Sequence, residues 1–211
     1  MNQVLNLEFL VEEPSTERAL RLLLPKIIPG VPFEIRDFRG KGRLLSQLPN
    51  RLLGYRSWID STSTCVVVVV DRDDDDCVEL NARLRRIAEQ AGMRTQPGPF
   101  GPVQVLIRIA IEELEAWFFG DVAAIQRAYP KVSVHLGKQA RYRDPDAITG
   151  GTWEALERVL QERGYHATGL RKLQAATDIA AYMDVEANRS GSFQAFREGL
   201  RRLVKEGDRD A

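Results

Sequence analysis

Five consecutive valines, Val66 to Val70, followed directly by Asp71-Arg72-Asp73, constrain the fold of this chain more than any other feature. β-Branched side chains favour strands, and a run that is apolar on both faces indicates a central strand that is covered on both sides. Asp71 then lies at the carboxyl end of a buried strand. In open α/β sheets, functional groups gather at that end of the strands.

Strand-like and helix-like patterns alternate along the chain up to residue 120. Further strands are expected at 5–11, 31–38 and 103–110, and helices after residue 15 and at 44–59, 77–91 and 111–119. This alternation predicts an α/β fold with a mainly parallel sheet flanked by helices. The remainder is mostly helical, most clearly at 152–163, 170–182 and 192–204. We expect a core over residues 1–122 and a helical C-terminal extension, residues 123–211, packed on it.

The charge balance excludes a strongly basic nucleic-acid-binding protein. The chain has 30 Lys plus Arg and 30 Asp plus Glu among 211 residues, so its formal net charge is zero. A polyanion would have to be held by a local basic patch, a metal ion or a second protein. The longest apolar run, residues 65–70, is too short to span a bilayer, and the N-terminus lacks a signal-peptide pattern. We expect a soluble cytoplasmic protein without a membrane partner, with Cys65 and Cys77 reduced.

Three acidic clusters begin where predicted strands end. Their members are Glu12, Glu13 and Glu17 after the first strand, Asp71 and Asp73 after the third, and Glu112, Glu113 and Glu115 after the fourth. The carboxyl ends of parallel strands share one edge of a sheet, so the clusters should meet there. Carboxylate oxygens are hard ligands for Mg²⁺ or Mn²⁺, and two such ions about 3.5–4 Å apart can stabilise the attacking and leaving oxygens of phosphoryl transfer.

Each cluster also has a structural interpretation. Glu17 could favour the positive end of the first helix, and the acids from Asp73 to Asp76 could cap the helix that begins near Cys77. A buried valine strand that ends in Asp-x-Asp is harder to explain by solubility alone. Glu112 and Glu115, three residues apart, are expected to share one helical face.

Basic and aromatic residues add further candidates. Lys41 follows the second strand in a glycine-flanked turn, where it could bind a phosphate or offset transition-state charge, although a solvated basic loop explains it equally well. Lys172 lies at a predicted helix start, where a cation opposes the helix dipole, and this mismatch favours a specific contact. The three tryptophans lie in apolar helical contexts and are interpreted as core residues. They are Trp58, Trp117 and Trp153.

Several catalytic classes lack their motifs. The chain has no GxxxxGK[ST] loop, which argues against a P-loop ATPase, and no nucleophile elbow for a Ser-His-Asp hydrolase. The two histidines lie outside the acidic clusters and have no cysteine at zinc-ligand spacing.

The acidic pattern resembles the Toprim fold of topoisomerases, primases and overcoming-lysogenization-defect (OLD) nucleases. Toprim proteins carry a glutamate after strand one, often with an acid four residues later, and an Asp-x-Asp after strand three. Glu13, Glu17 and Asp71-Arg72-Asp73 match this pattern. Pro14 replaces the glycine that usually follows the glutamate, so Glu12 remains an alternative first ligand. The match covers roughly residues 4 to 120.

A closer resemblance, over nearly the whole chain, is to a bacterial family of unknown function that is Toprim-like and related to the OLD nucleases. The matching segments are Val11-Glu12-Glu13-Pro14-Ser15, Gly40-Lys41-Gly42, Val70-Asp71-Arg72-Asp73, Glu113-Leu114-Glu115-Ala116-Trp117-Phe118 and Ser190-Gly191-Ser192-Phe193. The resemblance implies a nuclease subunit, often encoded beside an ABC-type or AAA-type ATPase, in phage-defence or mobile-element settings.

The resemblance also implies roles for individual residues. Glu13 would be the leading metal ligand and could act as the base for the attacking water, and Asp71 and Asp73 would hold Mg²⁺ or Mn²⁺ on the phosphate. Glu115 would bind a second metal ion or support the first. Lys172 could contact phosphate or correspond to a lysine site of the family. Nucleic acid is the expected substrate, with DNA favoured over RNA, and a homo-oligomer is compatible with the pattern.

Two alternatives to a nuclease are retained. A non-catalytic subunit could keep the fold and use the Glu-Ala-Trp segment and the C-terminal helices to dock an ATPase. A haloacid-dehalogenase-like phosphatase also has Asp-x-Asp after a buried strand. Its motif normally opens the chain, whereas here the motif follows the third strand.

Overall fold

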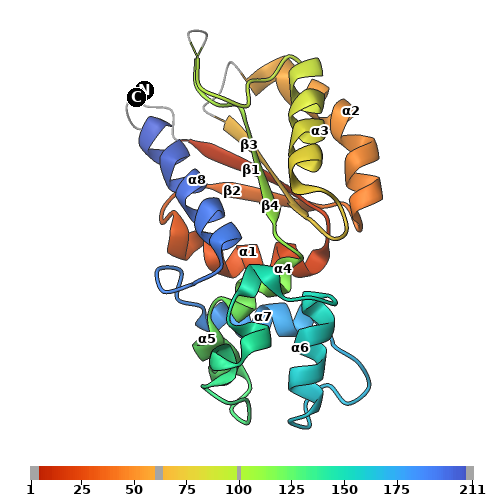
Figure 1. Ribbon diagram of the computed structural model, residues 1–211. Helices are drawn as coiled ribbons and strands as arrows, with labels where there is room; N and C mark the ends of the chain where they lie inside the picture. Colours follow the sequence, from red (N-terminus) through yellow and green to blue (C-terminus); the bar gives the residue numbers. More distant parts are fainter. Residues whose placement is uncertain (1–4, 60–63, 99–100, 208–211) are drawn as a thin grey trace.

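A four-stranded parallel sheet forms the centre of the computed structural model, which describes residues 5–59, 64–98 and 101–207. The strands are β1 (Asn6–Val11), β2 (Phe33–Asp37), β3 (Thr64–Asp71) and β4 (Val105–Ala110). Their order across the sheet is β2-β1-β3-β4, and each neighbouring pair is parallel (Figure 1). The predicted α/β class with a parallel sheet and a helical C-terminal segment is therefore confirmed.

Helices connect the strands and cover both faces of the sheet (Figure 1). They are α1 (Pro14–Ile27), α2 (Lys41–Ile59), α3 (Cys77–Gln90), α4 (Leu114–Phe119), α5 (Val122–Ala128), α6 (Thr152–Gln161), α7 (Lys172–Tyr182) and α8 (Gly191–Gly207), with 3₁₀ turns at Leu136–Lys138, Ala140–Tyr142 and Pro145–Ala147. No helix in the described part of the chain is long and apolar enough to cross a membrane.

The valine strand has the double burial expected from its sequence. Side chains alternate across a strand, so Val66, Val68 and Val70 pack in a cluster with residues of α2 and α3. Val67 and Val69 face the opposite way, into a cluster with residues of α1 and α8. All five valines are at most 1% exposed, which fixes β3 as a central strand.

The last helix, α8, packs on the same face of the sheet as α1. Phe193 and Phe196 of α8 are fully buried, and the Phe196 ring lies 6.5 Å from that of Phe9 in β1 and 4.9 Å from the indole of Trp117. The Trp117 Nε1–H donates a hydrogen bond to Ser192 Oγ at 3.0 Å. The C-terminal segment thus returns to the sheet, while α5, α6 and α7 lie beyond its carboxyl edge (Figure 1).

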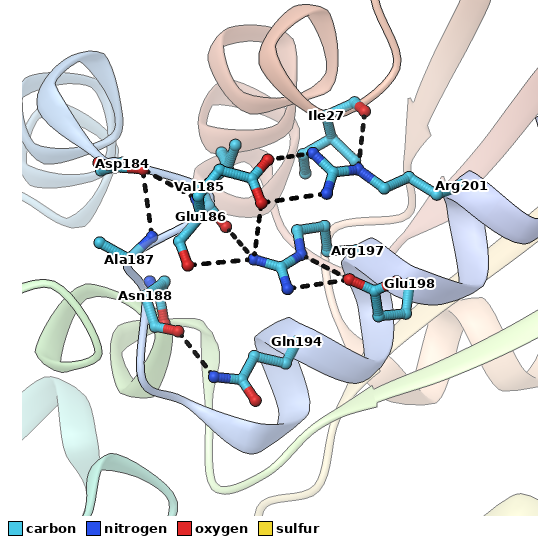
Figure 2. A network of polar contacts seen from close by, with 10 residues as sticks. All are labelled: Ile27, Asp184, Val185, Glu186, Ala187, Asn188, Gln194, Arg197, Glu198 and Arg201. Carbon is cyan, nitrogen blue, oxygen red and sulfur yellow. Dashed lines mark hydrogen bonds and ion pairs between the residues drawn. The ribbon is translucent and has the colours of Figure 1, made fainter.

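Two arginines fasten α8 to the loop before it, as Figure 2 shows. Arg197 Nη1 donates to the Val185 carbonyl at 2.6 Å, and its side chain is only 13% exposed. Arg201 pairs with Glu186 and donates from Nε to the Ile27 carbonyl at the end of α1 at 3.3 Å. These contacts tie α8 to α1 as well as to its own loop.

One predicted boundary is wrong in a way that affects the candidate site. The helix expected over 111–119 begins only at Leu114, because Glu112 adopts a left-handed conformation with φ of 61°. That conformation interrupts the chain between β4 and α4. Glu112 and Glu115 therefore do not share a helical face.

Candidate metal centre

Three carboxylates converge at the carboxyl ends of β1 and β3. Glu12 directly follows β1, Asp71 is the last residue of β3, and Asp73 lies two residues beyond it. One carboxylate oxygen from each lies within 4.8 Å of the other two. The backbone N–H of Asp71 also points at Glu12 Oε2, 3.4 Å away. Neighbouring parallel strands therefore bring together acids that are 59 residues apart in the sequence.

Burial makes this cluster electrostatically unfavourable without a cation. Glu12 is 5% exposed and Asp71 8%. Burial, followed by the negative charge of Asp73, raises the pKa of Glu12 to about 7, although the charge of Lys41 lowers it. Burial and the neighbouring Glu12 and Glu115 raise the pKa of Asp71 well above its usual range. A divalent cation would offset this repulsion, and oxygen ligands suit Mg²⁺ and Mn²⁺. The residues present therefore fit such an ion.

The loops after β3 and β4 are hydrogen-bonded to each other where they carry acids. The Arg72 N–H donates to the Ala110 carbonyl, and the Asp73 N–H donates to the Glu112 carbonyl, both at 2.9 Å. Asp73 has φ of 50°, and Glu112 has φ of 61°. Left-handed conformations are uncommon outside glycine, and strained residues cluster at functional sites. Here the strained geometry places the Asp73 carboxylate beside Glu12 and Asp71.

Lys41 holds the Asp-x-Asp loop in place. It is the first residue of α2, and its Nζ donates to the carbonyls of Asp71 and Arg72 at 2.8 Å each and to Asp73 Oδ2 at 3.1 Å. It also lies 2.6 Å from Asp75 Oδ2. Burial lowers the pKa of Lys41, but hydrogen bonds to Asp75 and Asp73 outweigh it and raise the pKa overall. The ammonium group therefore stays charged beside the carboxylates.

Glu115 and Lys172 form a second charged group next to the first. Glu115, in the first turn of α4, is 3% exposed, and burial raises the pKa of its carboxyl to about 7 while the charge of Lys172 lowers it. Lys172 begins α7, with its Nζ 3.9 Å from Glu13 Oε2 and 4.9 Å from the centre of the Trp153 ring. Burial lowers the pKa of Lys172, and the charges of Glu115 and Glu13 raise it by more. The C-terminal half of the chain thus contributes a cation to this edge.

Glu113 has a structural role beside this group. Its Oε2 accepts hydrogen bonds from the backbone N–H and hydroxyl of Thr152 and from the N–H of Trp153, each at 2.9 Å. These groups lie at the start of α6, so Glu113 caps that helix and compensates its unpaired N–H groups. The same cap positions Trp153 against Lys172.

The structure distinguishes the two glutamates that the sequence left open as first ligand. Glu12 belongs to the three-carboxylate cluster. Glu13 is half-buried, accepts a hydrogen bond from Ser15 Oγ at 3.2 Å and faces Lys172. Since Glu12 directly follows β1, it is Glu12 that lies level with the end of β3.

Other sequence candidates lie outside the cluster. Glu17 forms an ion pair with Arg21 one turn along α1, with 2.8 Å between the charged atoms. Glu112 forms an ion pair with Arg72. Asp76 caps α3, accepting from the N–H groups of its first turn, which confirms the structural interpretation of the last aspartate in the run.

The interpretation of the tryptophans is correct for one residue and wrong for another. Trp117 is fully buried, as expected, whereas Trp58 is 39% exposed on α2. Trp153 is half-buried and contacts Lys172, whose Nζ lies over its ring. Nothing in the local sequence indicates that contact, because it depends on how α6 packs beside α7.

These features define a class of protein: a parallel α/β fold with a buried, lysine-supported carboxylate centre at the carboxyl edge of its sheet. Residues 11–201 match the model of a family described as "Domain of unknown function (DUF4276)", and the chain belongs to this family. The matched range includes every residue of the centre, from Glu12 to Lys172. No curated protein and no solved structure matches the chain.

Proposed function

We propose that this chain is a divalent-metal-dependent nuclease of the Toprim-like type, acting on DNA in preference to RNA. The observation that carries the proposal is the cluster of Glu12, Asp71 and Asp73, whose oxygens lie within 4.8 Å of one another. Hard carboxylate ligands at a strand edge are suited to phosphoryl transfer because a cation there can face a phosphate.

Glu12, Asp71 and Asp73 would hold the Mg²⁺ or Mn²⁺ ion. When bound, the ion would act as a Lewis acid on a phosphoryl oxygen. Lys41, already oriented by the carbonyls of Asp71 and Arg72, lies where it can offset negative charge on the phosphate. Glu13, whose side chain is 38% exposed, would accept a proton from an attacking water.

Lys172 would offset the negative charge of Glu13 and Glu115. Its ammonium group lies 3.9 Å from Glu13, and the charges of Glu115 and Glu13 raise its pKa. Holding this cation beside Glu13 limits the negative charge at the edge where a phosphate must approach. In this proposal Lys172 is a positioning residue, and Glu115 supports the first ion or contributes to a second.

The cellular setting in this proposal is that of a cytoplasmic subunit that works with an ATPase in phage defence. The zero net charge supports a partner, because most non-specific affinity for nucleic acid comes from neutralised phosphates. A docking subunit without catalysis is the second candidate, since it would use the same fold and the same C-terminal helices.

The test is cleavage of plasmid, single-stranded DNA and RNA with Mg²⁺ or Mn²⁺. Asp71→Asn should lose cleavage while keeping the fold, because it removes a ligand charge with little change in volume. Asp74→Asn, an exposed position in the same loop, is the matched control and should cleave like the wild type. Wild-type cleavage by Asp71→Asn would rule out this centre. No cleavage by the wild type, with or without an ATPase, would favour the docking subunit.

A further inference from the structure

One segment of the chain departs from the overall balance of charge. Residues 38–59 contain no aspartate or glutamate, yet they carry Arg39, Lys41, Arg43, Arg51 and Arg56. This segment includes the whole of α2. Cations in the first turn of a helix oppose its dipole, so helix stability does not account for Lys41 and Arg43.

Three of these residues, Arg39, Arg43 and Arg51, border a groove between the edge strand β2 and the exposed face of α2. One hollow is lined by Arg36, Phe38, Arg39, Arg43, Gln47 and Arg51, with Asp37 as its carboxylate. It shares Gln47 and Arg51 with a second hollow along α2, and a third continues over Asn50, Tyr55 and Trp58. The second and third each measure about 350 Å³, which is within the usual range of ligand sites.

Most of the arginines along this groove lack a strong carboxylate partner. Within the described residues, Arg43 and Arg51 form no ion pair, and the Arg51 guanidinium lies 6.0 Å from the centre of the Phe38 ring. Arg39 is 77% exposed in its side chain and lies 3.9 Å from Asp37. Arg36 differs, since its Nε donates to Glu8 at 3.2 Å. By contrast, Arg197 and Arg201 of α8 are both paired with glutamates (Figure 2).

The first hollow is joined to the carboxylate centre by the chain itself, because its Arg39 and Arg43 lie two residues to either side of Lys41. Lys41 both starts α2 and holds the loop of Asp71 and Asp73, and the Gly40 N–H donates to the Glu12 carbonyl at 2.7 Å. From there α2 runs away along the outside of the sheet (Figure 1). At 1.5 Å per residue, the helix extends about 25 Å from Lys41 to Trp58.

The far end of the groove offers an aromatic surface. Trp58 is 39% exposed, and its ring lies 5.5 Å from that of Tyr55 at an angle of 60°. Bases of a single strand stack on exposed aromatic side chains, whereas the bases of a duplex are already stacked on one another. A row of arginines that leads to a tryptophan therefore matches a single-stranded nucleic acid better than a duplex.

We propose that this groove binds a single strand of nucleic acid and leads its phosphodiester backbone to the carboxylate centre. Arg39, Arg43 and Arg51 contact successive phosphates, and Trp58 stacks on a base. The inference rests on the proposed nuclease function for the identity of the polyanion. The binding itself requires neither a metal ion nor cleavage.

The test measures binding of a fluorescein-labelled single-stranded DNA 20-mer by anisotropy, in EDTA so that cleavage cannot interfere. The double variant Arg43→Ala/Arg51→Ala is compared with Arg83→Ala/Arg86→Ala, an equal loss of charge on the exposed face of α3. The groove variant should raise Kd about tenfold or more. It should also reduce the slope of log Kd against log salt by about 1.4, at 0.7 for each lost phosphate contact. The α3 variant should change Kd less than about twofold.

Two further variants separate the parts of the proposal. Trp58→Ala should weaken binding of the single strand by at least about fivefold, the lower end expected for one stacked base. Asp71→Asn should bind at least as tightly as the wild type in EDTA, because it removes a negative charge from the centre, so failure of the nuclease function would appear as lost or absent cleavage with binding retained. Equal Kd values for the groove and α3 variants would overturn the inference. So would tighter binding of a duplex that is insensitive to Trp58→Ala.

Discussion

Replacing Glu115 by glutamine should stabilise the metal-free protein at pH 8 and have little effect at pH 5. Glu115 is 3% exposed, and burial raises the pKa of its carboxyl from 4.5 to about 7, against the opposing charge of Lys172. An acid whose pKa is raised on folding binds more protons in the folded state. Its favourable contribution is therefore complete below pH 4.5 and is lost as the pH rises through about 7.

The size of the effect follows from the two pKa values. The difference between 4.5 and about 7 corresponds to roughly 3 kcal/mol of unfolding free energy at pH 8, and to less than about 1 kcal/mol at pH 5. In a chain of this length, 1 kcal/mol changes Tm by about 2–4 °C. Glutamine keeps the volume of the side chain and removes its charge. Glu115→Gln should therefore raise Tm by about 6–12 °C at pH 8.

Thermal melts followed by circular dichroism in EDTA, from pH 5 to pH 8, provide the assay. Glu113→Gln is the control, because Glu113 accepts three hydrogen bonds at the start of α6 and its loss of charge should lower Tm at pH 8. The reasoning is refuted if Glu115→Gln lowers Tm at pH 8, or if its effect is the same at pH 5 and pH 8. Either result would mean that the Glu115 carboxylate is not a buried charge.

Three further outcomes are expected. Mn²⁺ at about 100 times its Kd should stabilise the wild type by about 2.7 kcal/mol in a thermal melt at pH 8, and Asp71→Asn should lose that response. Glu113→Ala should lower the unfolding free energy in urea by about 1–2 kcal/mol because α6 loses its cap, and an unchanged value would contradict the capping role. Phe196→Ala should cost about 3–5 kcal/mol in the same assay, since the ring is fully buried between Phe9 and Trp117.

The sequence predicted the sheet and the Asp-x-Asp because both depend on local patterns. Five valines can be buried on two faces only in a central strand, and Asp71 then has to lie at its carboxyl end. Lys41 was placed at the same edge by the order of the elements, and it does contact Asp73. These inferences required no knowledge of how distant segments pack.

Some site residues are positioned by a single dihedral angle or by the packing of distant segments, and their positions could not be predicted from the sequence. Glu12 and Glu13 are adjacent, and successive side chains of an extended segment point to opposite sides. A shift of one residue in the predicted end of β1 therefore changes which of the two glutamates is expected to face the carboxylate cluster. Glu112 left its expected helix through one positive φ, which no residue type in that segment signals. Lys172 could be suspected from its helix position, but its neighbours Glu115 and Trp153 come from other helices.

The position of α8 has a consequence for how the chain folds during synthesis. Phe9 in β1 is synthesised long before Phe196 in α8, which covers it. Until α8 emerges from the ribosome, the face of the sheet beside α1 lacks part of its apolar cover. Exposed apolar surface on a partly folded chain promotes aggregation. The nascent chain therefore cannot complete this part of its core until α8 has been synthesised, and truncation before residue 191 should yield an aggregation-prone product.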